Sequence, residues 1–438
     1  MTIAAWIRER RATLRPEVAP LPWALNREWR FQDGVLRHRA DGFFSVFGAG
    51  ISAPGTGFHG LEMPMIHQPE VGLLGFVVAA RKDDCWWLLQ AKSEPGSVDF
   101  VQVAPTVQAT QSNYRQVHGG SVPPFLDFFQ EGDEPLLADT LQSEQGFRFD
   151  GKFNRNALRL VASRFECRHA SWRWFRAGDV RRALGEDFLI NTDARSAIVC
   201  APWRLICGRR GAFSSAPVRI ASDFVSALSA SYRTGCCGAA HLIGRLREAE
   251  SDNTMSMRRV PLERLKHWTI GEANIHCTDQ GADIEVGSYS VVAPGREVEH
   301  WHQPLFRGLN EHRAGLIFQQ RDGRLKTFLR FSAEPGFGRR VEYGPSYQTD
   351  GINPRWVEEL VLEMEHLPLL SIRQSDEGGR FMHAITCYAL HDLKDDNPLP
   401  ASEGGEWVDI AELEVLCRTA RVLTNEGRSA VSLLLSLA

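Results

Sequence analysis

Residues 90–110 organise this chain and read Gln-Ala-Lys-Ser-Glu-Pro-Gly-Ser-Val-Asp-Phe-Val-Gln-Val-Ala-Pro-Thr-Val-Gln-Ala-Thr. The stretch turns at Pro95-Gly96 and continues through a strand-like alternation of apolar and polar residues. A weaker copy begins 240 positions later, where residues 330–336 contain the same Glu-Pro-Gly and residues 341–348 end in Pro-Ser-Tyr-Gln. This constant displacement indicates that the chain contains a duplication.

Other blocks recur in the same order at nearly the same displacement. Pro22 and Trp29 return as Pro261 and Trp268, and the tripeptide at His67 returns at His302. Residues 143–149 return as 375–381, and residues 193–196 return as 426–429. The repeat predicts a first module over 15–215, a helical connector over 216–255 and a second module over 256–438.

Composition bounds the class of protein. The chain has 438 residues, of which 43% are hydrophobic and 24% charged, so a soluble protein of two domains is expected. A net charge of −4 gives no electrostatic case for a nucleic-acid or membrane partner, and an anionic ligand would need a local basic pocket. Nine cysteines without a Cys-x-x-Cys pair predict reduced thiols in a cytoplasmic protein.

Local patterns place strands before helices in each copy. Residues 73–80 and 85–90 predict a hairpin, and residues 316–320 and 327–330 predict its counterpart. Residues 179–184 and 193–207 predict helices, with Thr192 as the N-cap of the second. This order favours an α+β fold.

The polar string that ends the organising stretch is the first candidate for ligand binding. Thr106, Gln108, Thr110 and Asn113 can hydrogen-bond a base, a sugar or a diphosphate without carrying charge. The alternative is a polar loop that caps a following helix. Asn113 and Tyr114 have no counterparts in the second copy, which makes them the better functional candidates.

Titratable residues near this string could carry acid–base chemistry. The candidates are His67, Lys92, Glu94 and Tyr114, although any one of them taken singly is more often structural. The pair His300 and His302 could suggest a metal site. Because only His302 has a counterpart in the first copy, we expect no metal.

Two arginines that recur in both copies are candidates for phosphate contacts. The guanidinium groups of Arg148 and Arg195 offer planar forks that match phosphate oxygens. The alternative is a pair of structural salt bridges, with Glu144 or Asp193 as partners. No Gly-x-Gly-x-x-Gly follows a predicted strand and the chain has no P-loop, so dinucleotide and ATP chemistry have no support.

These blocks together resemble the NDP-hexose 2,3-dehydratases from about residue 23 to 434. The most specific pieces are residues 90–96, 103–110 with Asn113-Tyr114, 143–149 and 191–196. The resemblance implies a tandem duplication of two Nudix-hydrolase-like modules joined by a helical connector. It also implies a homodimer and no metal or redox cofactor.

The resemblance implies elimination of water across C2–C3 of dTDP-4-keto-6-deoxyglucose, followed by a separate 3-ketoreductase. We expect catalytic roles for His67, Tyr114, Lys92 and Glu94. We expect substrate-binding roles for Gln108, Thr106, Thr110, Asn113, Glu144, Arg148 and Arg195.

The second copy departs from the family pattern. Gln-Ala-Lys of the first copy is replaced by Arg330-Phe-Ser332, so we expect the second module to have lost its sugar-nucleotide pocket. Two alternatives stay open: a non-catalytic protein that binds or scaffolds sugar nucleotides, and a related lyase that acts on another nucleotide sugar.

Overall fold

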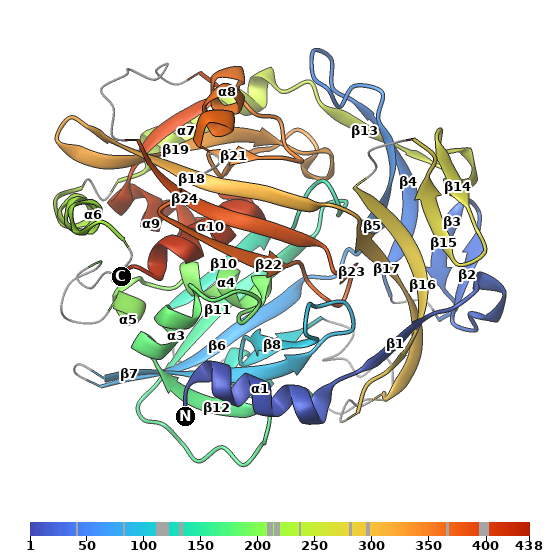
Figure 1. Ribbon diagram of the computed structural model, residues 1–438, viewed down its shortest axis with the longest axis horizontal. Coiled ribbons are helices and arrows are strands. Elements are labelled where there is room, and N and C mark those ends of the chain that lie inside the picture. The colour runs from blue at the N-terminus through green and yellow to red at the C-terminus, as the bar shows by residue number, and fades with distance from the viewer. Residues whose placement is uncertain are drawn as a thin grey trace.

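The two halves of the chain build equivalent sheets around a shared layer of helices (Figure 1). The computed structural model describes residues 1–40, 43–81, 84–110, 122–130, 135–207, 213, 220–235, 238–279, 283–294, 298–364, 368–393 and 403–438. Mixed sheets and helices agree with the α+β fold predicted from the sequence.

The first half supplies the following elements: α1 (Ile3–Leu14), β1 (Glu17–Pro20), η1 (Trp23–Leu25), β2 (Trp29–Gln32), β3 (Val35–His38), β4 (Ser45–Ser52), β5 (Glu62–His67), β6 (Gly72–Arg81), β7 (Asp84–Ser93), β8 (Val101–Ala104), β9 (Val107–Ala109), η2 (Leu126–Phe129), β10 (Ala138–Ser143), β11 (Phe153–Val161), β12 (Trp172–Arg176), α3 (Ala177–Ala183), α4 (Thr192–Val199) and α5 (Arg204–Cys207).

Two connecting helices and the second half follow: α6 (Ser222–Thr234), α7 (Ala240–Asp252), β13 (Ser256–Val260), η3 (Leu262–Arg264), β14 (Trp268–Ile270), β15 (Asn274–Cys277), β16 (Ile284–Val292), β17 (His300–Gly308), β18 (Glu311–Arg321), β19 (Arg324–Ala333), η4 (Pro335–Phe337), β20 (Val341–Gly344), β21 (Tyr347–Gln348), α8 (Arg355–Met364), β22 (Leu370–Ser375), β23 (Phe381–Met382), β24 (Ile385–Leu393), β25 (Gly405–Asp409), α9 (Ile410–Arg418) and α10 (Asn425–Leu435).

Each half contains one seven-stranded mixed sheet. The first has the order β10-β11-β6-β7-β12, with β8 on β7 and β9 on β6, and the second has β22-β24-β18-β19-β25, with β20 and β21 in the same places. The predicted hairpins β6–β7 and β18–β19 are confirmed. In β6, Leu74 and Phe76 pack towards the helices and Leu73 and Val77 pack on the opposite face, so both faces are covered and the strand reads as one apolar run.

The first strand of each half is exchanged into the other half. β1 pairs antiparallel with β16 of the second half, and β13 pairs antiparallel with β4 of the first. Two tryptophans complete the exchange: Trp29 Nε1 donates to the carbonyl oxygen of His302, and Trp268 Nε1 donates to that of Glu62, each at 2.8 Å. These two small sheets lie together on one side of the molecule (Figure 1).

The two Glu-Pro-Gly turns are also exchanged. Gly96 N donates to the carbonyl oxygen of Gly378 at 2.9 Å, and Gly336 N donates to that of Gly146 at 2.8 Å. A Cβ on Gly96 would lie 1.6 Å from the carbonyl oxygen of Phe381, so only glycine fits this approach. Each turn therefore locks its half onto the loop that follows β10 or β22 of the other half.

Helices α4 and α10 pack against each other between the two large sheets (Figure 1). Their contact is reciprocal, because Arg195 donates to Ser432 Oγ at 3.0 Å and Arg428 donates to Ser196 Oγ at 2.7 Å. Every residue of α10 is buried, so the apolar C-terminal helix is part of the core of this chain. The predicted N-cap of α4 was wrong by one residue: Asn191 Oδ1 accepts from Ala194 N, and Thr192 is the first helical residue.

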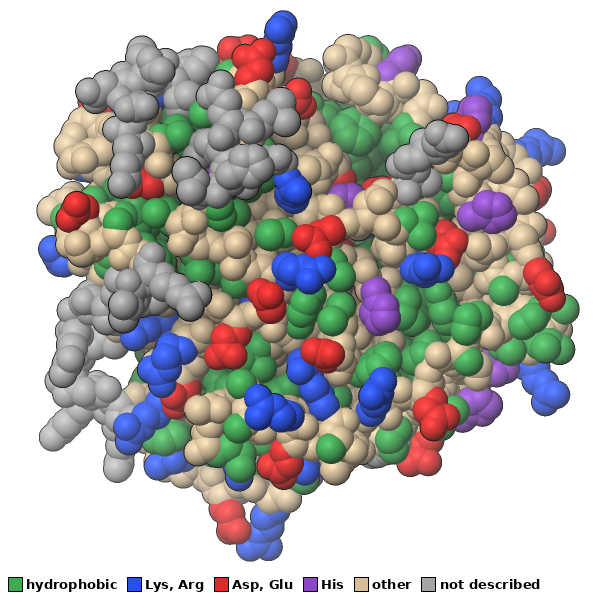
Figure 2. All heavy atoms as spheres, viewed as in Figure 1, with side chains coloured by type: hydrophobic (Ala, Val, Ile, Leu, Met, Phe, Trp, Pro, Cys, Tyr) green, Lys and Arg blue, Asp and Glu red, His purple; other side chains and the backbone are tan. Residues whose placement is uncertain are grey.

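The surface matches the composition. Figure 2 shows acidic and basic side chains interspersed over one face of the molecule, as expected from a net charge of −4. Across the described part of the chain, every cysteine is a free thiol. No helix within that part has the length and apolar character needed to cross a membrane.

Candidate active site

A groove of about 530 Å³ lies where the two halves meet. This volume falls in the range of sites that bury a ligand of the size of a nucleotide sugar. Its polar walls include Gln68, Lys92, Glu94, Gln108, Thr110, Lys152, Asn154, Asp193, Glu377 and Arg380, and its aromatic walls include Trp29, Phe43, Phe44, Trp172 and Trp301.

The end of β7 and the residue after it bring a cation and an anion to the groove. Residues 90–95 all line it, with Lys92 inside β7 and Glu94 directly after the strand. Lys92 Nζ lies 3.2 Å from Glu94 Oε1, and 5% of the Glu94 side chain is exposed. The ion pair is therefore shielded from solvent and fixed at the wall of the groove.

Gln108 of β9 connects two carboxyl groups. Its Nε2 donates to Glu94 Oε1 at 3.0 Å and to Asp193 Oδ2 at 2.5 Å, while its Oε1 accepts from Asn191 Nδ2 at 3.0 Å. Asn191 and Asp193 reach this place because Asn191 N donates to the carbonyl oxygen of Val103, which sets the start of α4 beside β8. The nitrogen and the oxygen of the Gln108 amide are both used, so its orientation is fixed.

Asp193 is a buried carboxyl group with other carboxyl groups nearby. It is 3% exposed, and burial raises its pKa well above its ordinary value, with Glu377, Glu144 and Glu94 adding to the rise. A carboxyl group with a raised pKa keeps its proton to a higher pH and can therefore act as a general acid.

Two further charged residues lie at or beside the groove: Lys152, directly before β11, and Glu144, directly after β10. Burial lowers the pKa of Lys152, whose Nζ donates to the carbonyl oxygen of Glu70. Glu144 lies beside the groove, where it accepts from Asn154 Nδ2 at 2.7 Å and from Asn425 Nδ2 at 2.5 Å. Burial, followed by Glu377, raises the pKa of Glu144 to about 7.

The second half contributes directly to this groove. Glu377, Gly379 and Arg380 lie in the loop after β22, which the Gly96 turn holds in place. Arg380 Nε donates to Gln68 Oε1 at 3.1 Å, and the guanidinium lies 4.2 Å from the centre of the Phe44 ring. The groove is therefore a joint product of both halves.

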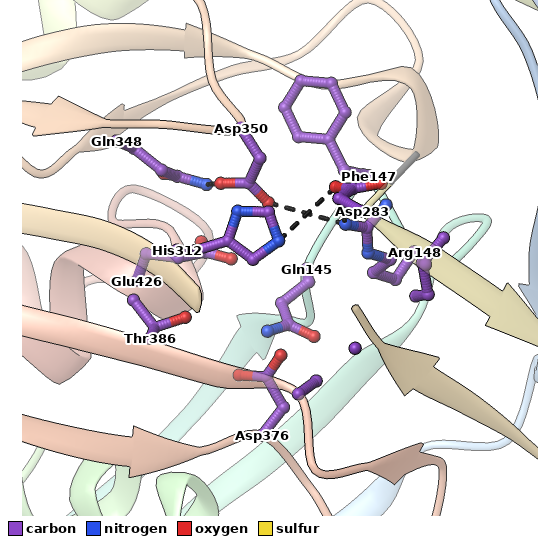
Figure 3. A pocket seen from close by; sticks show the side chains of 13 residues that line it. Gln145, Phe147, Arg148, Asp283, His312, Gln348, Asp350, Asp376, Thr386 and Glu426 are labelled. Atoms are coloured by element: carbon purple, nitrogen blue, oxygen red, sulfur yellow. Dashed lines mark hydrogen bonds and ion pairs between the residues drawn. The ribbon is translucent and has the colours of Figure 1, made fainter. Parts of the chain in front are cut away.

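The equivalent pocket of the second half has a volume of about 20 Å³. Figure 3 shows its lining, in which Asp350 and His312 lie side by side and face Arg148 and Asp283 across a narrow space. Arg330 stands where the first copy has Gln90, is fully buried, and donates to Gln348 Oε1 at 2.6 Å. A buried guanidinium and short side-chain contacts thus occupy the space that is open in the first half.

Two residues that were predicted to bind substrate are buried inside the protein. Thr106 is fully buried, where its Oγ1 accepts from Val77 N at 3.0 Å and donates to the carbonyl oxygen of Leu88. Arg195 is also fully buried, and its guanidinium donates to the carbonyl oxygens of Leu184 and Ile190 and to Ser432. Neither side chain lines the groove, because each satisfies backbone or helix–helix contacts.

Two other predicted residues lie away from the groove because of the exchange between halves. Arg148 lines the small pocket of the second half, 3.0 Å from Asp283 Oδ2 and 3.8 Å from Asp350 Oδ2. His67 is the last residue of β5, and its Nδ1 lies 3.4 Å from Asp150 Oδ2 and 3.1 Å from Arg259 Nη2. The corresponding residues of the second copy, Arg380 and His302, line the large groove instead.

The remaining predicted residues divide into two groups. Lys92, Glu94, Gln108 and Thr110 line the groove, and Glu144 lies beside it. Asn113 and Tyr114 lie outside the described residues.

Sequence reasoning missed Lys152, Asp193, Glu377 and Arg380 as residues of the groove. Asp193 was weighed only as a salt-bridge partner, although it stands in the same recurring block as Arg195. A usable signal was the identity of Glu-Pro-Gly in both copies, since a turn retained while its neighbours diverge indicates a contact between the copies. Among the described residues, no group of three or more His, Cys, Asp or Glu side chains is arranged to hold a metal ion.

Comparison with known proteins gives consistent matches over the whole chain. The sequence profile of the NDP-hexose 2,3-dehydratases matches residues 1–201 and 239–434. A dTDP-4-dehydro-6-deoxy-alpha-D-glucopyranose 2,3-dehydratase of Saccharopolyspora spinosa is 31% identical, covering 99% of this chain and 90% of the relative. Proteins of the same description from Amycolatopsis orientalis and Streptomyces violaceoruber are 30% and 28% identical, each over 98% of this chain and over 89% and 95% of their own lengths.

Proposed function

The chain belongs to the NDP-hexose 2,3-dehydratase family, and on this premise we propose that its large groove eliminates water across C2–C3 of dTDP-4-keto-6-deoxyglucose. The protein is a dehydratase, a carbon–oxygen lyase of deoxysugar biosynthesis. The observation that carries the site assignment is the open groove lined by Lys92, Glu94, Gln108 and Asp193, against a second pocket of about 20 Å³.

The substrate itself makes the elimination possible. Its C4 ketone acidifies the proton at C3, so a base can remove that proton and leave an enediolate whose charge rests on the C4 oxygen. The C2–O bond then breaks, and the hydroxyl leaves as water once an acid has protonated it. The enol that remains tautomerises to a 3,4-diketo-2,6-dideoxy sugar, and no hydride moves.

The groove provides groups with the charges these steps need. Lys92 presents an ammonium group that can stabilise the growing charge on the C4 oxygen. Glu94, whose Oε1 lies 3.2 Å from Lys92 Nζ, is the base in this proposal. Asp193, whose pKa burial raises, is the acid that protonates the departing C2 hydroxyl. Gln108 holds both carboxyl groups at a fixed separation.

The wider setting follows from the chemistry and the family. A vicinal diketone linked to a nucleotide is unstable, so a separate 3-ketoreductase is the partner that consumes it. We propose a cytoplasmic homodimer built from two Nudix-like modules per chain. The matching strand orders of the two large sheets support this duplicated architecture.

Turnover of dTDP-4-keto-6-deoxyglucose tests the proposal. The wild-type protein should release dTDP and produce maltol from the decomposing product, and Asp193→Asn should lower this rate by roughly 100-fold, the size of a typical general-acid effect. If the substrate raises the melting temperature but no dTDP appears, the protein is a sugar-nucleotide binding protein. Release only from another nucleotide-linked keto-sugar would assign a related lyase.

A further inference from the structure

The decisive feature is a loop in each half that carries an arginine into the site of the other half. Residues 143–149 and 375–381 contain Arg148 and Arg380 at equivalent positions. Gly146 N donates to Glu334 Oε2 at 2.7 Å, and His383 N donates to the carbonyl oxygen of Gly96 at 2.8 Å. Because each loop is anchored by the opposite Glu-Pro-Gly turn, the arginines reach opposite pockets.

The guanidinium group of Arg148 is paired with carboxylates of the protein. Its side chain is 12% exposed and contacts the carboxylates of Asp283 and Asp350 (Figure 3). Burial lowers the pKa of Arg148, but these two carboxylates outweigh that effect and raise it overall. A guanidinium neutralised twice in a pocket of about 20 Å³ has neither the charge nor the space for a diphosphate.

Arg380 has the opposite environment. Its Nε and Nη1 donate to neutral acceptors, the side chain of Gln68 at 3.1 Å and the carbonyl oxygen of Gly379 at 2.7 Å. Its plane packs on Phe44. Within the described ranges, no carboxylate lies at ion-pair distance, and Nη2 has no hydrogen-bond partner. The group is held in place with its charge uncompensated, as an anion-binding arginine should be.

A second cation of the groove also lacks a carboxylate at ion-pair distance among the described residues. Lys152 is 6% exposed, and its Nζ donates to a backbone carbonyl oxygen, that of Glu70. Burial lowers the pKa of Lys152 overall, Glu377 and Glu144 oppose this lowering, and Arg380 adds to it by a smaller repulsion. Two cations that repel each other across one groove favour a dianionic ligand group between them.

We propose that Arg380, supplied by the second half, is the diphosphate contact of the dTDP-sugar groove, and that Arg148 has no role in substrate binding. This inference rests on the proposed function for the identity of the ligand. It also explains what the second half contributes to the reaction. Its own pocket is filled, but its loop completes the binding site of the first half.

Paired variants at the two equivalent arginines test the inference. Arg380→Gln should weaken binding of dTDP by about 10- to 100-fold, the loss expected for charge-assisted hydrogen bonds, and should raise KM more than it lowers kcat. Arg380→Lys should recover part of the affinity, because it restores the charge without the planar fork. Arg148→Gln should bind dTDP like the wild type.

Binding of thymidine separates a phosphate contact from a general defect. Calorimetry should show unchanged thymidine affinity in Arg380→Gln, together with a shallower salt dependence of dTDP binding. Equal loss of thymidine and dTDP affinity, or wild-type dTDP affinity in Arg380→Gln, would overturn the inference. A wild-type protein that binds dTDP through Arg380 without turning over the keto-sugar would overturn the proposed function and leave this contact standing.

Discussion

The two halves of the molecule match closely where they hold each other and differ where they could hold a ligand. The Glu-Pro-Gly turns, the exchanged strands β1 and β13, and the arginine–serine contacts between α4 and α10 are all present twice. The pockets have diverged from about 530 Å³ to about 20 Å³. Both halves need the contacts between them in order to fold together, so these contacts are retained. A single open site is enough for one reaction, so the second pocket was free to change.

Two differences in sequence explain much of why the pocket of the second half is closed. The strand that presents Gln90 and Lys92 in the first half presents Arg330 and Ser332 in the second. Arg330 turns inward to Gln348, and Ser332 Oγ donates to Glu334 Oε1 at 2.9 Å. The second half thus has hydrogen bonds among its own side chains where the first half has the lysine–glutamate pair.

The largest expected difference between the halves is in catalysis. Lys92→Met should lower turnover by roughly 100- to 1000-fold, because it removes the charge proposed to stabilise the enediolate. Ser332→Ala, the substitution at the equivalent position, should leave turnover unchanged. Steady-state release of dTDP measures both rates.

A double variant, Lys92→Met with Glu94→Gln, controls for the buried carboxylate that loses its partner. It should fold with a melting temperature close to that of the wild type and remain inactive. Equal effects of Lys92→Met and Ser332→Ala on turnover would contradict the division between an active and a filled pocket.

Stability should respond equally to the same change in either half. Gly96→Ala and Gly336→Ala each place a Cβ within 2 Å of a carbonyl oxygen of the other half, at 1.6 Å and 1.8 Å. Each should lower the free energy of unfolding by about 3 kcal/mol or more, at the upper end of overpacking effects. Urea denaturation measures this free energy.

Gly244→Ala in α7 is the matched control, because its Cβ would meet no atom within 4 Å. It should be neutral or stabilise by up to about 1 kcal/mol through helix propensity. A large stability loss in only one of the two turn variants would show that the joint between the halves is asymmetric.

A smaller effect is expected from pH. Burial raises the pKa of Glu334 from 4.5 to about 7, although Arg330 opposes the rise. The folded state therefore binds this proton more tightly than the unfolded state, and the free energy of unfolding falls as pH rises from about 4.5 to 7. Glu334→Gln should remove about 1–3 kcal/mol of this fall.

Urea denaturation at pH 5.5 and pH 8 gives the measurement, with the exposed Glu263→Gln as control. Glutamine can keep both contacts, by accepting from Gly146 N and donating to Ser332 Oγ. A wild-type pH dependence in Glu334→Gln would assign the titration to other buried carboxyls, such as Asp376, whose pKa burial raises to about 6.

The sequence grouped Lys92, Glu94 and Gln108, which line the groove, with Arg148 and His67, which do not. The first three stand in one stretch, in which β7 leads through the Glu-Pro-Gly turn to β8 and β9 of the same sheet. Arg148 and His67 were assigned to the first site because each block was taken to serve its own copy. The exchanged turns place their counterparts Arg380 and His302 there instead.

The sequence by itself determined the family, the duplication, the paired hairpins and the loss of the Gln-Ala-Lys motif in the second copy. These features depend on residue identity, spacing and local periodicity, which a linear chain records. Only the tertiary structure decided which half each loop serves, because a loop's partner depends on contacts between residues far apart in the chain, 188 positions in the case of Gly146 and Glu334. It also showed that Thr106 and Arg195 are buried. Residue type alone does not distinguish a polar side chain that hydrogen-bonds buried backbone from one that contacts a substrate.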